Sequence, residues 1–188
     1  MSVLYFENRG GSSNKWNYSD SSKEGFMTQI QGTVVEVKEV AATKFNSNEI
    51  DRWPDGHAKI NVCLVIQGQS GKELEWVFSP GSVVKPTPAM QACRTALQAA
   101  GYPAVSVAEL GGMTVNISTV QPPEGFSYGV GNPRPWTVQI VGAGTVPFRG
   151  VTEYEEVPAP PAPAAAPVMQ APPVEQVPVE VYGEDIPF

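Results

Sequence analysis

The alternation of hydrophobic and polar residues predicts five β-strands and one helix. Alternation with a period of two favours strands over residues 28–40, 58–67, 73–79, 111–120 and 134–144. The intervening segment 86–102 changes to helical spacing. The residues at helical spacing, expected to face inward, are Met90, Cys93 or Arg94, Leu97 and Ala100. Thr87 is the expected N-cap, and Gly101 is the expected stop signal. We therefore expect an all-β protein with one helix between its third and fourth strands.

The first strand carries a slip in its alternation. Ile30 and Val34 share one parity, whereas Val35 and Val37 take the other. A slip of one residue is typical of a β-bulge, which bends a strand so that it can serve two sheets. With the order of three strands, one helix and two strands, a bent first strand favours an OB-fold, a five-stranded partly open barrel. Other small barrels and sandwiches have compatible orders.

The strand patterns also predict which side chains face the core. The clearest inward sets are Ile60, Val62, Leu64 and Ile66; Met113, Val115 and Ile117; and Trp136, Val138 and Ile140. Leu74, Trp76 and Phe78 share one parity as well. Alternation alone leaves Trp76 and Trp136 with two placements, in the core or on a binding face.

Composition divides the chain into four parts. Residues 1–26 are rich in Ser, Asn and Gly and predict a flexible arm, although Tyr5, Phe6, Trp16 and Tyr18 are unusual in such a segment. Residues 27–150 hold the periodic pattern and are the expected folded domain. A disordered Pro/Ala/Val/Glu linker is expected over 151–181, before an acidic tip at 182–188; residues 157–188 contain nine of the 19 prolines.

The net charge of -7 belongs to the C-terminal part of the chain. Residues 153–188 hold seven acidic side chains and no Lys or Arg, whereas residues 1–152 hold 12 acidic and 12 basic ones. Such asymmetry is typical of an interaction tail. The neutral domain also argues against a strongly basic nucleic-acid surface.

The last residues, "EDIPF", resemble the C-terminal tip of the bacterial single-stranded DNA-binding protein family. The matching positions are Glu184, Asp185, Ile186, Pro187 and Phe188. "LEWVFS" followed by a helix and "GGMTVNI" is similar to the third strand, helix and fourth strand of that family. The resemblance implies an OB-fold domain and a tip that docks onto replication, recombination and repair proteins. The Phe and Ile would fill an apolar pocket, and the terminal carboxylate would meet an Arg or Lys.

The chain also departs from that family. The 26-residue arm precedes a domain that normally starts near the N-terminus, the loop between the first two strands is long, and the domain is neutral. We therefore interpret the chain as a divergent member, encoded by a bacterium or a bacteriophage. These departures leave the oligomeric state open, a homo-oligomer included.

An OB-fold binds a single strand by stacking bases on aromatic rings along a cationic groove. Two loops have this composition: "TKFNSNEIDRWPDGHAK", which also contains His57, and "QPPEGFSYGVGNPRPW". The alternatives are a tryptophan folded over the barrel mouth and a merely solvated hairpin. The predicted DNA contacts are Lys44, Phe45, Arg52, Trp53, Lys59, Lys72, Trp76, Phe126, Tyr128, Arg134 and Trp136.

The sequence predicts no enzyme, no cofactor and no metal. His57 is the only histidine, and its loop lacks a cysteine or serine placed as a nucleophile. Glu49, Asp51 and Asp55 match no known cation loop and favour a solvated turn. Cys63 and Cys93 are expected to be small buried residues of a reducing compartment. With no apolar run long enough to span a membrane and no secretory signal, we expect a cytoplasmic protein.

Two functions fit these observations. The first is a protein that coats single-stranded DNA without sequence specificity and recruits partners through its tip. The alternative is an OB-fold adaptor or decoy that binds protein or RNA, whose tail mimics the tip to capture host replication factors. The neutral charge of the domain favours the alternative.

Overall fold

A computed structural model describes residues 14–45, 47–129 and 131–156 of the 188-residue chain. It confirms a mostly β protein with one α-helix between the third and fourth strands. The expected linker beyond residue 156 and the tip at 182–188 lie outside the described residues. The elements are β1 (Gln29–Ala41), β2 (Ile60–Gln67), β3 (Glu73–Phe78), α1 (Pro88–Ala99), the 3-10 helix η1 (Val107–Leu110), β4 (Met113–Thr119), β5 (Trp136–Ala143) and β6 (Val151–Thr152).

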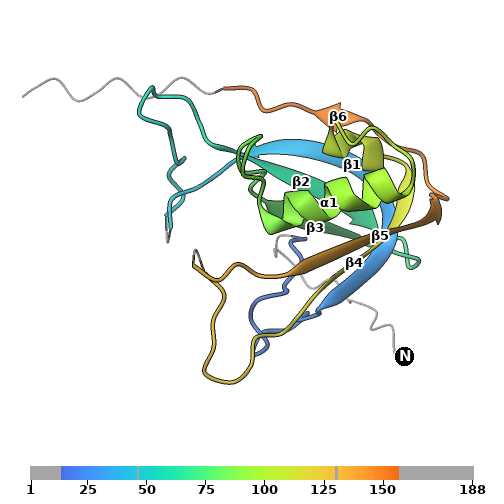
Figure 1. The fold of residues 1–188 in the computed structure, drawn as a ribbon, viewed down its shortest axis with the longest axis horizontal. Helices are drawn as coiled ribbons and strands as arrows, with labels where there is room; N and C mark the ends of the chain where they lie inside the picture. Colours follow the sequence, from blue (N-terminus) through green and yellow to red (C-terminus); the bar gives the residue numbers. More distant parts are fainter. Residues whose placement is uncertain (1–13, 46, 130, 157–188) are drawn as a thin grey trace, which may run out of the picture. The chain divides into compact units, whose positions relative to one another are not determined.

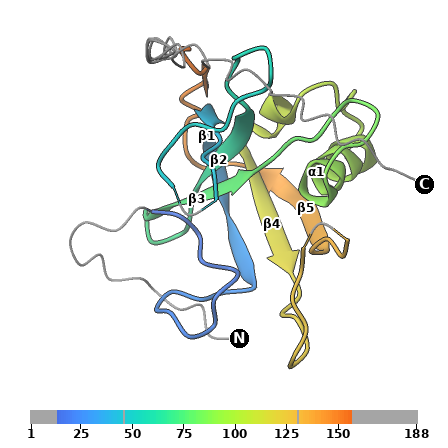
Figure 2. The same ribbon diagram turned by 90° about the vertical axis from the view of Figure 1, so that its left-hand side faces the viewer.

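The strands form one sheet around the long strand β1. The order is β3-β2-β1-β4-β5, with antiparallel neighbours, and β6 pairs with β1 in parallel. Residues 33–41 of β1 pair with β2, and residues 29–33 pair with β4. The pairing with β2 shifts between Val34 and Glu36, which confirms the predicted bulge. Figures 1 and 2 show β1 curving between its two partners. Among the described residues, no pairing joins β3 to β5.

The inner face of this sheet packs against α1. The helix begins after Thr87, whose hydroxyl accepts from the Met90 N–H, as predicted. Ala89, Met90, Cys93, Ala96 and Leu97 are buried together with residues from all five long strands, in one core. The expected burial of Ala100 is wrong, because it is the exposed C-cap. Cys93, rather than Arg94, occupies the core position between Met90 and Leu97.

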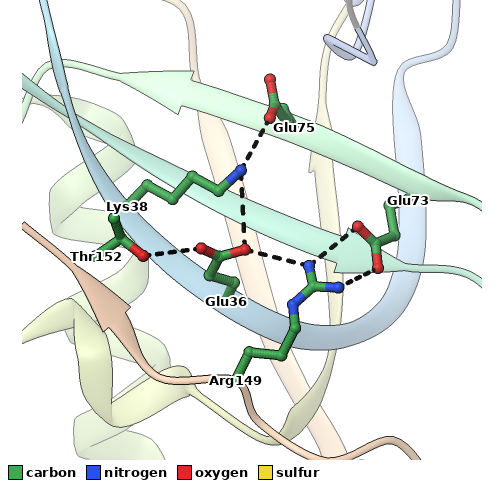
Figure 3. A network of polar contacts seen from close by, with 6 residues as sticks. All are labelled: Glu36, Lys38, Glu73, Glu75, Arg149 and Thr152. Atoms are coloured by element: carbon green, nitrogen blue, oxygen red, sulfur yellow. Dashed lines mark hydrogen bonds and ion pairs between the residues drawn. The ribbon is translucent and has the colours of Figure 1, made fainter.

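A smaller cluster lies apart from the main core, where the slip of β1 turns Val35 away from it. Val35 packs with Cys63 and Val65, and Val146 partly covers them. Next to this cluster, Arg149 donates to both oxygens of Glu73, at 2.7 and 3.0 Å, and to Glu36 at 3.2 Å. Thr152 also donates to Glu36, and Lys38 pairs with Glu36 and Glu75 (Figure 3). The network fastens β6 and the segment before it to the sheet, beyond the expected domain end at residue 150.

Residues 14–26 pack against the sheet, although their composition predicts part of a flexible arm. The Trp16 N–H donates to the Glu75 carbonyl at 2.9 Å, and the Glu75 N–H donates to the Asn14 carbonyl at 2.8 Å. The Trp16 indole N–H donates to the Met27 carbonyl at 2.8 Å, and only 4% of Trp16 is exposed. Trp16 is the one fully buried ring of this segment, so no hydrophobic period marks it. Residues 1–13 lie outside the described residues.

Both cysteines are free and buried, as expected. Burial raises the pKa of Cys63 to about 11 and that of Cys93 to about 12, so neither thiol supplies a thiolate near neutral pH. Within the described ranges, no helix combines the length and apolarity needed to cross a membrane.

Candidate nucleic-acid interface

The loop between β1 and β2 has regular backbone pairing and is not an irregular connection. Isolated bridges pair Thr43 with Ile50 and Arg52 with Ala58. At its end, the Trp53 N–H donates to the His57 carbonyl at 2.8 Å, and the Gly56 N–H donates to the Trp53 carbonyl at 2.9 Å. Gly56 has a φ of 92°, a conformation that glycine adopts without strain. The backbone therefore holds Trp53 in a defined turn.

Trp53 is the exposed aromatic side chain of this turn. Its exposed fraction is 55%, and the Lys59 ammonium lies 5.0 Å from its ring centroid. Lys59 is in turn held by Asp51 at 2.9 Å. Such a pair offers a π-face for stacking with a cation beside it. Phe45, in the same loop, is 93% exposed, and Lys44 pairs with Glu49 at 2.8 Å.

The turn also binds a carboxylate from the segment after β6. Glu156 lies 2.9 Å from His57 Nδ1 and 3.5 Å from Arg52 Nη1, and it accepts from the Ala58 N–H at 3.3 Å. The hydrogen bond with Glu156, followed by the charge of Glu156 and that of Asp55, raises the pKa of His57. The His57 hydrogen bond chiefly lowers the pKa of Glu156. We call Arg52, His57 and the Ala58 N–H the carboxylate clamp.

The loop between β4 and β5 presents a second aromatic group. Phe126 and Tyr128 pack edge to face, with ring centroids 5.6 Å apart. The Arg134 guanidinium lies 4.6 Å from the Tyr128 ring centroid and 5.3 Å from that of Tyr18. It donates to the carbonyls of Tyr18 and Val120, both at 3.2 Å. Arg134 thus connects this loop to the N-terminal segment.

Trp136, at the start of β5, lies beside an open hollow of about 310 Å³. Its other walls include Tyr18, Asn61, Arg134 and the start of α1 at Thr87. The Tyr18 and Trp136 rings meet edge to face at 4.8 Å. Burial raises the pKa of Tyr18, and the nearby Arg134 charge opposes this effect. Both loops leave the sheet on the left of the view in Figure 1.

Trp76 is a core residue, which corrects its assignment as a stacking surface for DNA. It is 0% exposed and lies 4.4 Å from the Phe78 ring and 4.9 Å from the Trp136 ring, centroid to centroid. Trp16 contacts its ring at 6.4 Å. No base can reach Trp76 in this conformation. Trp136 is half-buried, since it packs on this cluster and also borders the hollow.

Apart from the buried Trp76, the predicted residues fall into two groups and one outlier. Lys44, Phe45, Arg52, Trp53 and Lys59 share the β1–β2 loop. Lys72 is a half-buried residue of the β2–β3 turn. The second group, around the hollow and the β4–β5 loop, comprises Phe126, Tyr128, Arg134 and Trp136.

Sequence reasoning missed Tyr18 and Glu156. The aromatic character of Tyr18 in a polar segment was a usable signal, because disordered segments are poor in aromatics. The contact of Glu156 with His57 joins residues 99 positions apart, and nothing local predicts it.

Carboxylates of the chain neutralise many of its cations. In the part of the chain that the structure describes, ion pairs involve Lys23, Lys38, Lys44, Arg52, Lys59 and Arg149. Glu49 and Asp51 bind lysines in this way. No cluster of three or more His, Cys, Asp or Glu side chains suited to a metal ion occurs among the described residues.

Comparison with known proteins gives no relative. The chain matches no protein-family model, no curated protein and no solved structure.

Proposed function

We propose that this chain binds single-stranded DNA without sequence specificity, through an OB-fold domain, in the cytoplasm of a bacterial cell. The order of the strands, the bulge in β1 and the position of α1 support the OB-fold. The open ends of the sheet at β3 and β5 are bridged by the aromatic packing of Trp76, Trp16 and Trp136.

The observation that carries the proposal is the exposed Trp53 ring beside Lys59. An exposed tryptophan contributes little to folding, whereas each base stacked on an aromatic ring contributes about 1–3 kcal/mol to binding. The turn fixes the backbone that carries the ring before any ligand binds, which reduces the entropy lost on binding. Stacking tolerates every base because each base has a π-face, so the surface would bind without sequence preference.

The second group extends this surface on the other loop. Phe126 is 42% exposed, and Arg134 is oriented by Tyr18 and Tyr128. A single-stranded DNA that contacts both loops would cross the sheet between them.

Fluorescence titration of the whole chain with oligothymidine, at low and at high salt, tests this function. We expect quenching with an affinity that falls steeply with salt, because phosphate contacts release counterions. Trp16 and Trp76 are buried, so the quenching should come from Trp53 and Trp136. Absence of binding at low salt would contradict the proposal.

Glu184, Asp185, Ile186, Pro187 and Phe188, which lie outside the described residues, are proposed to recruit replication, recombination and repair proteins. Deletion of Ile186–Phe188 should leave the oligothymidine affinity unchanged and abolish recruitment. Unchanged recruitment by the shortened chain would contradict the role of the tip.

The pairing of cations with carboxylates favours a second candidate, an OB-fold adaptor or decoy that binds protein or RNA. Lys44, Lys59 and Arg52 all have carboxylate partners in the β1–β2 loop region. The oligothymidine titration separates the first function from the protein-binding form of this candidate, because a protein-binding barrel would show no affinity for the oligonucleotide.

A further inference from the structure

We infer that Arg52, His57 and the backbone N–H of Ala58 form a binding site for one backbone phosphate of the nucleic acid, which Glu156 occupies in the free protein. The inference rests on the proposed function and adds His57 and Glu156 to its residues. It assigns the clamp a ligand class, the phosphodiester, and assigns Glu156 the role of an internal competitor.

The geometry of the clamp is that of an anion site. Three donors of different kinds converge on one carboxylate: an imidazole at 2.9 Å, a backbone N–H at 3.3 Å and a guanidinium at 3.5 Å. The Arg52–Ala58 bridge and the hydrogen bonds of the turn set the backbone positions of Arg52, His57 and Ala58. Arg52 is further oriented by the Gly56 carbonyl, to which its Nη1 donates at 2.7 Å. Contacts that do not involve the carboxylate therefore hold the backbone of the clamp and the Arg52 guanidinium.

A phosphodiester suits these donors as well as a carboxylate does. It offers two anionic oxygens, and arginine, histidinium and backbone N–H groups are frequent partners of phosphate. The site is also open, since the side chains of His57 and Glu156 are 69% and 43% exposed. A ligand from solvent can displace the Glu156 carboxylate without any movement of the core.

The position of the clamp beside Trp53 indicates nucleic acid rather than a free anion. Arg52 precedes Trp53 in the chain, and His57 lies opposite Trp53 across the turn, joined to it by a backbone hydrogen bond of 2.8 Å. Lys59 lies on the Trp53 ring. A base stacked on Trp53 would place a neighbouring phosphate within reach of the clamp. The two contacts would then act on one nucleotide unit.

Displacement of Glu156 has a measurable consequence for the salt dependence. In the wild-type chain, a phosphate that enters the clamp replaces one anion with another, so little net charge is neutralised there. When residue 156 is neutral, the same contact brings a phosphate to the clamp without displacing another anion. Each phosphate neutralised on a single strand adds about 0.7 to the slope of log affinity against log salt.

The test compares the wild-type chain with Glu156→Gln and with Glu155→Gln, a control that removes the same charge one residue away. The ligands are oligothymidine, an abasic oligomer of equal length, and inorganic phosphate. We expect Glu156→Gln to bind oligothymidine about two- to fivefold more tightly than Glu155→Gln, which is the range for loss of an exposed competing ion pair. Its salt slope should be steeper by about 0.7.

Resonances of the His57 ring and the Ala58 amide give a second readout that does not depend on stacking. In the Glu156→Gln variant, these resonances should shift until they reach saturation when the abasic oligomer is added. Inorganic phosphate should bind more weakly.

Equal oligothymidine affinities and slopes for the two variants would overturn the inference while leaving the proposed function intact. Failure of all three chains to bind oligothymidine would overturn the proposed function and the inference together. Saturation by inorganic phosphate at equal or lower concentration than the abasic oligomer would assign the clamp to free phosphate and overturn the nucleic-acid assignment.

Discussion

Two tryptophans, Trp76 and Trp53, lie in opposite environments. Trp76 is 0% exposed and is surrounded by the rings of Trp16, Phe78 and Trp136. Trp53 is 55% exposed and contacts the Lys59 ammonium. Both match the expectation of an aromatic residue on a single-strand binding surface, and only Trp53 has a ring face available to a base.

The difference teaches that partners distant in sequence decide the role of an aromatic residue. Trp76 becomes a core residue because residues 14–26 and β5 supply rings that cover it. Trp53 stays exposed because its turn is closed by backbone hydrogen bonds and needs no hydrophobic partner. The first ring should therefore act on stability, and the second on binding.

Replacement of Trp76 gives the largest expected effect. Trp76→Ala should lower the free energy of unfolding by about 3–5 kcal/mol, because it leaves a cavity among packed rings. Trp76→Phe should lower it by less, since the indole N–H has no hydrogen-bond partner among the described residues. Denaturant unfolding of both variants measures these changes. A Trp76→Ala chain with wild-type stability would contradict the core assignment.

Replacement of Trp53 should act on binding alone. Trp53→Ala is expected to weaken oligothymidine binding by about 1–3 kcal/mol, the contribution of one stacked base. Its unfolding free energy should change by less than about 0.5 kcal/mol, as for other surface substitutions. Tyr102→Ala, which removes an exposed aromatic residue after α1, is the matched control. If both variants bind as tightly as the wild type, Trp53 carries no stacking.

The smallest effect concerns the pH dependence of the turn that holds Trp53. Because the pKa of His57 is raised in the folded chain, the His57–Glu156 pair stabilises the fold fully below the ordinary value of 6.5. This contribution is lost as the pH rises through the folded-state pKa. Titration followed by NMR should give a His57 pKa above 6.5 in the wild type and a lower one in Glu156→Gln. Equal values in the two chains would exclude the contact with Glu156 as the cause.

The sequence predicted those features that depend on local periodicity. The slip at Val35 indicated the bulge, and Thr87 indicated the start of α1, because each signal lies within a few residues of the feature that it specifies. The placements of Trp16 and Glu156 could not be predicted. Each depends on a single side chain that meets a surface built from distant segments. The presence of aromatic residues in the polar segment 14–26 was the one hint available.

The pairing of residues 14–16 with β3 has a consequence for association between chains. β3 ends the sheet, and an end strand with unpaired backbone groups can recruit the strand of another molecule. Here the Glu75 N–H and carbonyl are already bonded to Asn14 and Trp16, and Lys15 lies between them. A chain shortened to begin at Met27 would expose these groups together with the Trp76 ring. The N-terminal segment thus covers part of the β3 edge, and its loss would expose backbone groups with which another chain could pair.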